Sequence, residues 1–323
     1  MNKTKIDWCD MSWNPVTGCR HNCEYCYARK IARRFAGGGY EKEMGMFIAK
    51  YKEKIFQPPY ELSEPQLAKT KDEWYREAPY PFGFEPTFHR YRLDEPKQKT
   101  KPRNIFVCSM ADLFGDWVPD EWIRAVFDEC IVSAPWHRYL FLTKNPGRYD
   151  SAIDNYAAED RGCSDTTESF ENCWFGTSVT SQADAEKIET LSRLPEGHRF
   201  LSIEPILGPV TLNLKKNRCP ICGSDEVYRD NPKTCQGEKP WYCDCCGMWE
   251  SEDGADLKPD IDWVIIGSET GNRKEKVIPQ RAWIESIVAD CRVAGIPVFM
   301  KSSLTDIWGA PLIQEFPWGD AHD

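Results

Sequence analysis

Short apolar runs alternate with amphipathic stretches along most of this chain. The apolar runs lie at Ser12–Val16, Ile105–Cys108, Tyr139–Leu142, Cys173–Gly176, Arg199–Ile203, Trp263–Ile266 and Pro297–Met300. Stretches with helical periodicity lie between several of them, at Pro119–Ser133, Gln182–Arg193 and Gln280–Ala294. Alternation of this kind predicts right-handed βαβ units and a parallel sheet of about seven strands.

A different pattern covers residues 40–102. This segment is rich in proline and aromatic residues, and it lacks the alternation. We interpret it as an irregular elaboration with short helices at Tyr40–Ile55 and Glu64–Glu77, since a structureless loop of this length is uncommon. Just before it, Tyr27–Phe35 is predicted to be a helix that ends at three consecutive glycines.

Polar or small residues follow most of the predicted strands. These segments are Ser109–Asp112, Thr143–Asn145, Thr177–Thr180, Glu204–Pro205 and Gly267–Gly271. Each one alone is typical of a turn or a helix cap. Because ligands of parallel α/β proteins gather at the carboxyl ends of the strands, the set together predicts a polar cavity there.

The composition is that of an acidic globular protein. Hydrophobic residues make up 41%, and 41 Lys and Arg are outnumbered by 51 Asp and Glu, which gives a net charge of −10. Such a surface does not attract nucleic acid as a whole, although Arg29, Lys30, Arg33 and Arg34 form a local basic cluster. No apolar run approaches the roughly 18 residues of a membrane span, and no signal-peptide pattern is present, so we expect a cytoplasmic protein without membrane contact.

Cys19, Cys23 and Cys26 are spaced C-x3-C-x2-C near the N-terminus. In a chain expected to remain in a reducing compartment, such cysteines are better interpreted as metal ligands than as disulfides. Three thiolates can hold three irons of a 4Fe-4S cluster and leave the fourth iron open, whereas electron-transfer clusters are closed by four cysteines. The alternative interpretation is a zinc knuckle or three unrelated buried thiols.

This motif resembles that of the radical S-adenosylmethionine (SAM) superfamily. The resemblance includes Gly18, Tyr25 and Tyr27 beside the cysteines. It implies a partial (β/α) barrel with the cysteine loop after its first strand, where the alternation alone would also allow a doubly wound open sheet. It also implies that SAM binds the open iron, accepts an electron that comes from an external donor, and is cleaved to a 5′-deoxyadenosyl radical.

The resemblance further implies which residues contact SAM. Tyr25 is expected near the adenine and Ser178 near the ribose, and the segment after the second strand is expected to meet the amino group. That segment lacks the Gly-Gly-Glu usual in the superfamily. The residues implied as cofactor contacts are Tyr25, Ser109, Asp112, Lys144, Ser178 and Glu204.

Segments along most of the chain are similar to a phage- and prophage-associated radical SAM family of unassigned reaction. They are Trp13–Cys19, Ser109–Gly115, Leu142–Lys144, Gly176–Val179, Leu201–Pro205 and Asp262–Gly267. The run from Cys23 to Arg29 is also similar, locally, to spore photoproduct lyase, which repairs a thymine dimer in DNA.

A second set of cysteines interrupts the alternation at residues 215–258. Two C-x2-C-G knuckles lie there with a separation typical of a zinc ribbon. The alternative is an auxiliary iron–sulfur cluster. The predicted zinc ligands are Cys219, Cys222, Cys243 and Cys246.

Taken together, the patterns predict an α/β protein. Residues 1–214 and 259–323 are expected to form a radical SAM partial barrel, and 215–258 an inserted zinc ribbon. Two substrate classes remain open for the enzyme: nucleic acid, which the phage resemblance, the ribbon and the basic cluster favour, and a protein or peptide, which suits the acidic surface. A non-enzymatic, metal-stabilised binding module is the third hypothesis, and it requires zinc at Cys19, Cys23 and Cys26.

Overall fold

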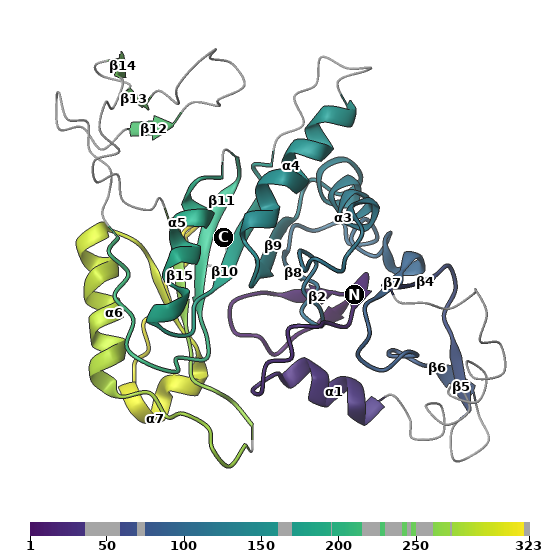
Figure 1. The fold of residues 1–323 in the computed structure, drawn as a ribbon, viewed down its shortest axis with the longest axis horizontal. Helices are drawn as coiled ribbons and strands as arrows, with labels where there is room; N and C mark the ends of the chain where they lie inside the picture. Colours follow the sequence, from purple (N-terminus) through teal and green to yellow (C-terminus); the bar gives the residue numbers. More distant parts are fainter. Residues whose placement is uncertain are drawn as a thin grey trace. The chain divides into compact units, whose positions relative to one another are not determined.

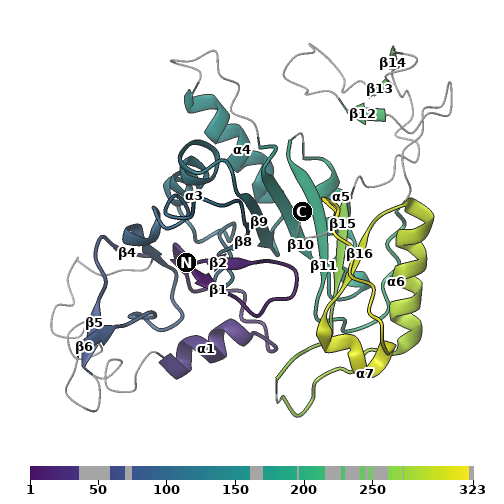
Figure 2. The same ribbon diagram turned by 180° about the vertical axis from the view of Figure 1, so that it is seen from behind.

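A computed structural model of the chain describes residues 1–35, 59–69, 75–160, 170–194, 196–214, 227–229, 241–243, 247–249, 261–271 and 273–319. The chain divides into two compact units. The first consists of Met1–Trp174 and Thr270–Lys276, and the second of Phe175–Glu269 and Val277–Asp323. Figure 1 and Figure 2 show the ribbon from opposite sides.

The first unit contains a sheet of mainly parallel strands. Its strands follow one another in the order β1 (Asn2–Lys3), β2 (Met11–Trp13), β8 (Asn104–Val107) and β9 (Arg138–Thr143). Strand β1 is antiparallel to β2, whereas β2, β8 and β9 are parallel to one another. Every residue of β8 is buried, as expected for an inner parallel strand whose two faces are both covered.

Buried aromatic rings join this sheet to its helices. The helices are α1 (Tyr27–Phe35), α3 (Asp120–Phe127) with its π-helical continuation η2 (Asp128–Ser133), and α4 (Gly147–Asp160). Helices α3 and α4 pack against each other (Figure 1). The ring of Phe127 lies 5.7 Å from that of Phe141 in β9, and Tyr149 lies 4.4 Å from Phe114. All four side chains are almost fully buried, so they form a large part of the apolar core of this unit.

A smaller sheet is formed by residues that precede β8 in the chain, and the cysteine loop starts at the end of one of its strands. Its order is β3 (Val16–Thr17), β7 (Thr87–His89) and β4 (Tyr60–Leu62). The short 3-10 helix η1 (Arg90–Arg92) follows β7 directly. Because β3 ends at Thr17, this sheet fixes the point from which the chain enters Gly18 and Cys19.

The predicted helix at Glu64–Glu77 is wrong. Strands β5 (Leu67–Lys69) and β6 (Tyr75–Glu77) pair there in antiparallel register. Lys, Glu and Ala are helix formers, but the free energy of that intrinsic preference is small. The backbone hydrogen bonds of a strand pair outweigh it. The other helix predicted in this region, Tyr40–Ile55, lies outside the described residues.

The second unit also contains mainly parallel strands. Its order is β10 (Cys173–Ser178, shared with the first unit at its start), β11 (His198–Ile203), β15 (Trp263–Ile266) and β16 (Val298–Met300). Strands β11, β15 and β16 are parallel. The helical segments are η3 (Gln182–Asp184), α5 (Glu186–Ser192), α6 (Arg281–Ala294), η4 (Ser302–Leu304) and α7 (Thr305–Trp308). A separate antiparallel sheet consists of β12 (Val227–Arg229), β13 (Trp241–Cys243) and β14 (Gly247–Trp249).

The expectation of a mixed α/β protein with mainly parallel strands is confirmed. A strand occupies each apolar run that predicted one, and the helix predicted at Tyr27–Phe35 is α1. Within the described residues the sheets are open, and no closed barrel is formed. None of the helices in the described part of the chain combines the length and hydropathy needed to cross a membrane.

Candidate metal and cofactor site

The three N-terminal cysteines lie in one loop between β3 and α1. Backbone hydrogen bonds hold this loop at both ends: Cys19 N–H donates to Phe84 O at 3.1 Å, and Cys26 N–H donates to Cys23 O at 3.2 Å. In the first turn of α1, Arg29 N–H donates to the Cys26 sulfur at 3.3 Å. All three cysteines are partly exposed. The loop therefore presents its thiols on a fixed backbone.

Gly18 lets this loop pass close to a second segment of backbone. Its φ of +89° lies in the left-handed region, and a Cβ at this position would lie 2.2 Å from the carbonyl oxygen of Glu85. Gly18 N–H also donates to Met110 O at 2.9 Å. Only glycine allows both the conformation and the close approach.

A buried polar pair supports the residue before Gly18. The hydroxyl of Thr17 lies 2.9 Å from Nε2 of His89, and both side chains are buried. Burial, together with the nearby Arg92, lowers the pKa of His89 to about 2, so the ring is neutral. The start of the cysteine loop is thus joined to β7 by a side-chain bond as well as by sheet pairing.

The described residues of the cysteine loop do not form a site for a single metal ion. Among the described residues, no three His, Cys, Asp or Glu side chains converge closely enough to hold a single ion. Cluster ligands differ in this respect, because each thiolate binds a different iron. Burial raises the pKa of Cys19 to about 12, and Asp112, Cys23 and Cys26 act in the same direction. These effects favour the protonated thiol of Cys19 over its thiolate.

Tyr25 and Lys144 are brought together from distant parts of the sequence. Lys144, directly after β9, donates from Nζ to the phenol oxygen of Tyr25 at 2.8 Å. The same Nζ lies 5.2 Å from the centroid of the ring. Burial raises the pKa of Tyr25, and the ammonium group opposes that effect. Two residues predicted to contact one cofactor are thus neighbours in the structure.

Asp112 joins the cysteine loop to the end of β9. Its Oδ1 accepts from Phe114 N at 3.1 Å and from the Thr143 hydroxyl at 2.7 Å. Its Oδ2 accepts from Lys144 N at 3.0 Å and from His21 Nε2 at 2.7 Å. A carboxylate offers about four acceptor positions, and four protein donors occupy them. These four donors give Asp112 a positioning role, and the cofactor contact expected of it stays a prediction.

His21 is a site residue that the sequence reasoning missed. It lies between Cys19 and Cys23, and its ring packs edge-on against Trp117 at 4.9 Å while it donates to Asp112. Its place inside the cysteine motif was the available signal. A buried acid that follows a strand needs donors, and a histidine within the adjoining loop is a suitable one.

Ser109 connects α1 to the end of β8 through its backbone carbonyl group. Its carbonyl oxygen accepts from the phenol of Tyr27 at 2.7 Å, which connects the first turn of α1 to the end of β8. Its hydroxyl donates to Asn14 Oδ1 at 3.2 Å, and the same amide oxygen accepts from Met110 N at 2.9 Å. Asn14, which was not predicted, therefore organises the segment that follows β8.

The remaining predicted contacts, Ser178 and Glu204, belong to the second unit. Ser178 is buried at the end of β10. Glu204 follows β11 and forms an ion pair with Lys301, which follows β16. Gly267 follows β15, the strand between them, and a Cβ there would lie 3.0 Å from Lys301 Cδ and 3.3 Å from Glu204. Lys301 was missed, although the rule of polar strand ends would have found it.

A comparison with family models places the whole of this region in one family. A model described as "Protein of unknown function (DUF5131)" matches residues 3–310. The chain belongs to this family. No curated protein and no solved structure matched it. The matched range includes the cysteine loop, the strand ends of both units and the second set of cysteines.

Most of the predicted zinc ligands lie outside the residues that the structure describes. Cys219, Cys222 and Cys246 lie outside the described residues, and of Cys243 only the backbone is described, in β13. The backbone of Cys243 pairs with Gly247 across β13 and β14. The zinc ribbon therefore stays a prediction, alongside a three-stranded antiparallel sheet.

Proposed function

We propose that this protein is a radical SAM enzyme with a partial barrel fold. Cys19, Cys23 and Cys26 would hold a 4Fe-4S cluster, and SAM would bind at the iron that no cysteine occupies. The observation that carries the proposal is the position of Tyr25. It lies inside the cysteine loop and is bonded to Lys144 from the end of β9. In a simple metal knuckle the cysteines alone hold the ion, and a contact between Tyr25 and a lysine at the end of a strand would serve no purpose.

Cys19, Cys23 and Cys26 would hold a cluster whose chemistry, when bound, would be one-electron reductive cleavage of a C–S bond of SAM, giving methionine and a 5′-deoxyadenosyl radical for hydrogen abstraction from the substrate. The electron comes from an external one-electron donor. The residues of this chain orient and shield the reactants. Lys144 sets the phenol of Tyr25 and offers a positive charge beside it, and Asp112 holds Lys144 and His21 in place.

The second set of cysteines suits this proposal without being required by it. A structural zinc at Cys219, Cys222, Cys243 and Cys246 would stabilise an insert too small for a core of its own. An auxiliary iron–sulfur cluster at the same ligands would add a second redox centre. The radical chemistry needs neither.

The proposal is tested by anaerobic reconstitution of the full chain with iron and sulfide. We expect about four irons per chain at the N-terminal site, with broad absorbance in the visible range. With a strong one-electron reductant and SAM, 5′-deoxyadenosine should form and be detected by chromatography. Replacing Cys19, Cys23 and Cys26 together by Ala should abolish this iron binding and the product.

Cys9→Ala is the matched control, because Cys9 is another partly exposed cysteine of the first unit and lies outside the loop. It should keep both iron and SAM cleavage. If the triple variant still cleaved SAM, the assignment of the cluster would be wrong. If the loop of the unaltered protein bound zinc and no iron, a non-enzymatic binding module would be the better description.

A further inference from the structure

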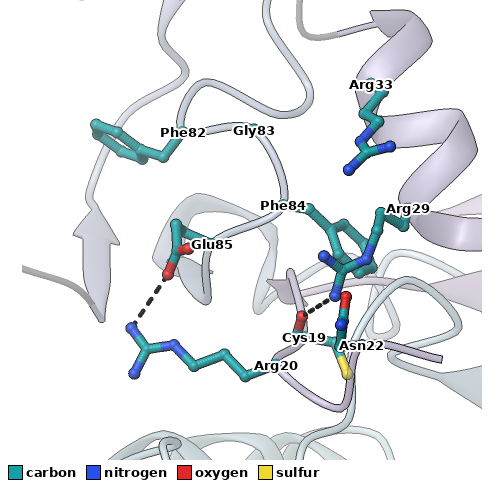
Figure 3. A pocket seen from close by; sticks show the side chains of 9 residues that line it. All are labelled: Cys19, Arg20, Asn22, Arg29, Arg33, Phe82, Gly83, Phe84 and Glu85. Atoms are coloured by element: carbon teal, nitrogen blue, oxygen red, sulfur yellow. Dashed lines mark hydrogen bonds and ion pairs between the residues drawn. The ribbon is translucent and has the colours of Figure 1, made fainter. Parts of the chain in front are cut away.

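A cavity of about 430 Å³ lies beside the cysteine loop, in the first unit. This is within the size range of small-ligand sites. Its walls come from the loop, from α1 and from the segment before β7 (Figure 3). The lining includes Cys19 itself, so a ligand held here would be next to the predicted cluster.

Positive charge dominates the polar lining. Arg20, Arg29 and Arg33 contribute guanidinium groups, and Glu85 is the only acid among the lining residues. Arg20 pairs with Glu85 at 3.1 Å, and both of these side chains are about half exposed. Arg33 is exposed and has no acidic partner in the part of the chain that the structure describes. Among the described residues, the lining of the cavity therefore carries more positive charge than neighbouring acids neutralise.

Protein contacts hold the Arg29 side chain in place but leave one of its hydrogen-bond donors without an acceptor. Its Nη2 donates to Cys19 O at 3.2 Å, and its guanidinium lies 5.2 Å from the centre of the Phe84 ring. Its Nε is buried and finds no acceptor among the described residues. In Figure 3, Arg29 and Arg33 project from the same side of α1. A buried Nε–H group without an acceptor among the described residues is a position that an acceptor of a ligand can fill.

We propose that this cavity binds the sugar–phosphate backbone of a single-stranded nucleic acid and places that strand beside the cluster loop. Arg20 and Arg33 contact phosphate, and Arg29 supplies a flat, ring-supported cation at the centre of the site. The inference rests on the proposed function only in taking the bound strand to be the substrate.

Phosphate fits these groups better than the carboxylates of an acidic peptide do. The planar fork of arginine matches phosphate bidentately, and the site uses only arginine among its cations. A base can also stack on a guanidinium plane or on an aromatic ring. Phe84 lies under Arg29, and Phe82 is stacked on Tyr60 with ring centres 3.9 Å apart. The whole chain has a net charge of −10 and would repel a polyanion. The three arginines therefore define where an anionic strand can bind.

The test is the binding of a labelled single-stranded oligothymidylate to the full chain, measured by fluorescence anisotropy at several salt concentrations. We expect Arg20→Ala and Arg33→Ala each to raise Kd by about tenfold, as the loss of a charged hydrogen bond does. Each should also reduce the slope of log K against log salt by about 0.7, the value for one phosphate contact with a single strand. Circular dichroism establishes that each variant is folded.

Arg34→Ala is the matched control. Arg34 is the exposed neighbour of Arg33 on α1, it carries the same charge, and it does not line the cavity. Its removal should leave Kd and the salt slope nearly unchanged. An equal loss in Arg34→Ala would overturn the proposal, because the effect would then belong to general charge. Equal affinity for polyglutamate would overturn it as well, in favour of a peptide ligand.

The two proposals fail separately. SAM cleavage by the unaltered protein is measured in the same preparation, in the absence of oligonucleotide. Cleavage without arginine-dependent binding would overturn the nucleic-acid site and leave the radical SAM assignment intact. Binding that depends on Arg20 and Arg33 in a protein unable to cleave SAM would do the opposite.

Discussion

Asp112 shows how one side chain can couple the candidate metal loop to the sheet. Each of its oxygens accepts one backbone N–H, from Phe114 or from Lys144, and one side-chain donor, from Thr143 or from His21. The residue is 4% exposed, so water cannot replace a missing partner. The acid therefore sets the position of Lys144, and through it the contact with Tyr25.

Replacing Asp112 by Asn should destabilise the protein by about 1–3 kcal/mol, the cost of an unsatisfied buried donor. Either orientation of the new amide turns its NH₂ group toward a backbone N–H, because each carboxylate oxygen accepts one. Urea unfolding monitored by circular dichroism measures the change. Asp116→Asn is the control, since Asp116 is exposed and, among the described residues, accepts a hydrogen bond from Asn145 alone. Equal stabilities of the two variants would contradict the positioning role.

At this scale the sequence identified candidate residues but not their roles. Tyr25 and Lys144 were both predicted near one cofactor, and they are in contact. Asp112 was predicted as a direct contact, although its acceptor positions are filled by the protein. Which donors surround a carboxylate depends on residues far apart in the chain, such as His21 and Thr143. The cysteine motif marks His21 as a candidate, but no local pattern pairs it with Asp112.

The cysteine loop is the element on which the proposed chemistry depends. It leaves a two-residue strand, β3, and enters α1 at Tyr27. Between these points, backbone hydrogen bonds join it to Phe84 and Met110, and Gly18 forms a β-bridge with Ala111. Its path requires Gly18 to pass within contact of Glu85 O. A side chain there would move the loop away from both segments.

Gly18→Ala should cost at least about 3 kcal/mol, from left-handed strain together with the steric overlap, and should reduce iron binding after reconstitution. Gly271→Ala separates the two causes. Gly271 also has a left-handed φ, of +91°, but a Cβ there would meet nothing within 4 Å. We expect that control to cost only about 1 kcal/mol and to bind iron normally. Chemical denaturation and iron analysis measure both effects, and equal losses in the two variants would show that the close approach is unimportant.

Elements were predictable where apolar periodicity was strong. The buried runs of β8, β11 and β15 were recognised from sequence because an inner parallel strand is apolar on both faces. Helix α4 was missed because its buried positions, Tyr149, Ala152, Ile153 and Tyr156, are surrounded by Asp, Ser and Asn, which are weak helix formers. The β5–β6 pair was mistaken for a helix because its strands are short and largely exposed.

At the scale of the whole molecule, the two sets of cysteines belong to different units. The loop with Cys19, Cys23 and Cys26 is in the first unit, and residues 215–258 fall within the second. If each set holds its own metal, the two metals should respond independently to substitution.

Cys219→Ser should therefore abolish bound zinc while leaving the iron content of the reconstituted N-terminal site unchanged. Elemental analysis of the purified chain should find about one zinc per chain in the unaltered protein, as a four-cysteine site holds one ion. Cys245→Ser is the control, because Cys245 lies between the predicted ligands Cys243 and Cys246 without being one. It should keep its zinc. Additional iron in place of zinc would instead identify an auxiliary iron–sulfur cluster.

By itself the sequence determined the kind of fold and the donor atoms available to a metal. Strand periodicity and cysteine spacing are local properties, and burial preferences make them readable along the chain. Only the tertiary structure decided which side chains meet: Lys144 with Tyr25, His21 with Asp112, and the arginines of α1 and the cysteine loop around one cavity. The residues in each of these contacts are far apart in the sequence. The packing of the apolar core brings them together and sets the geometry of the contact.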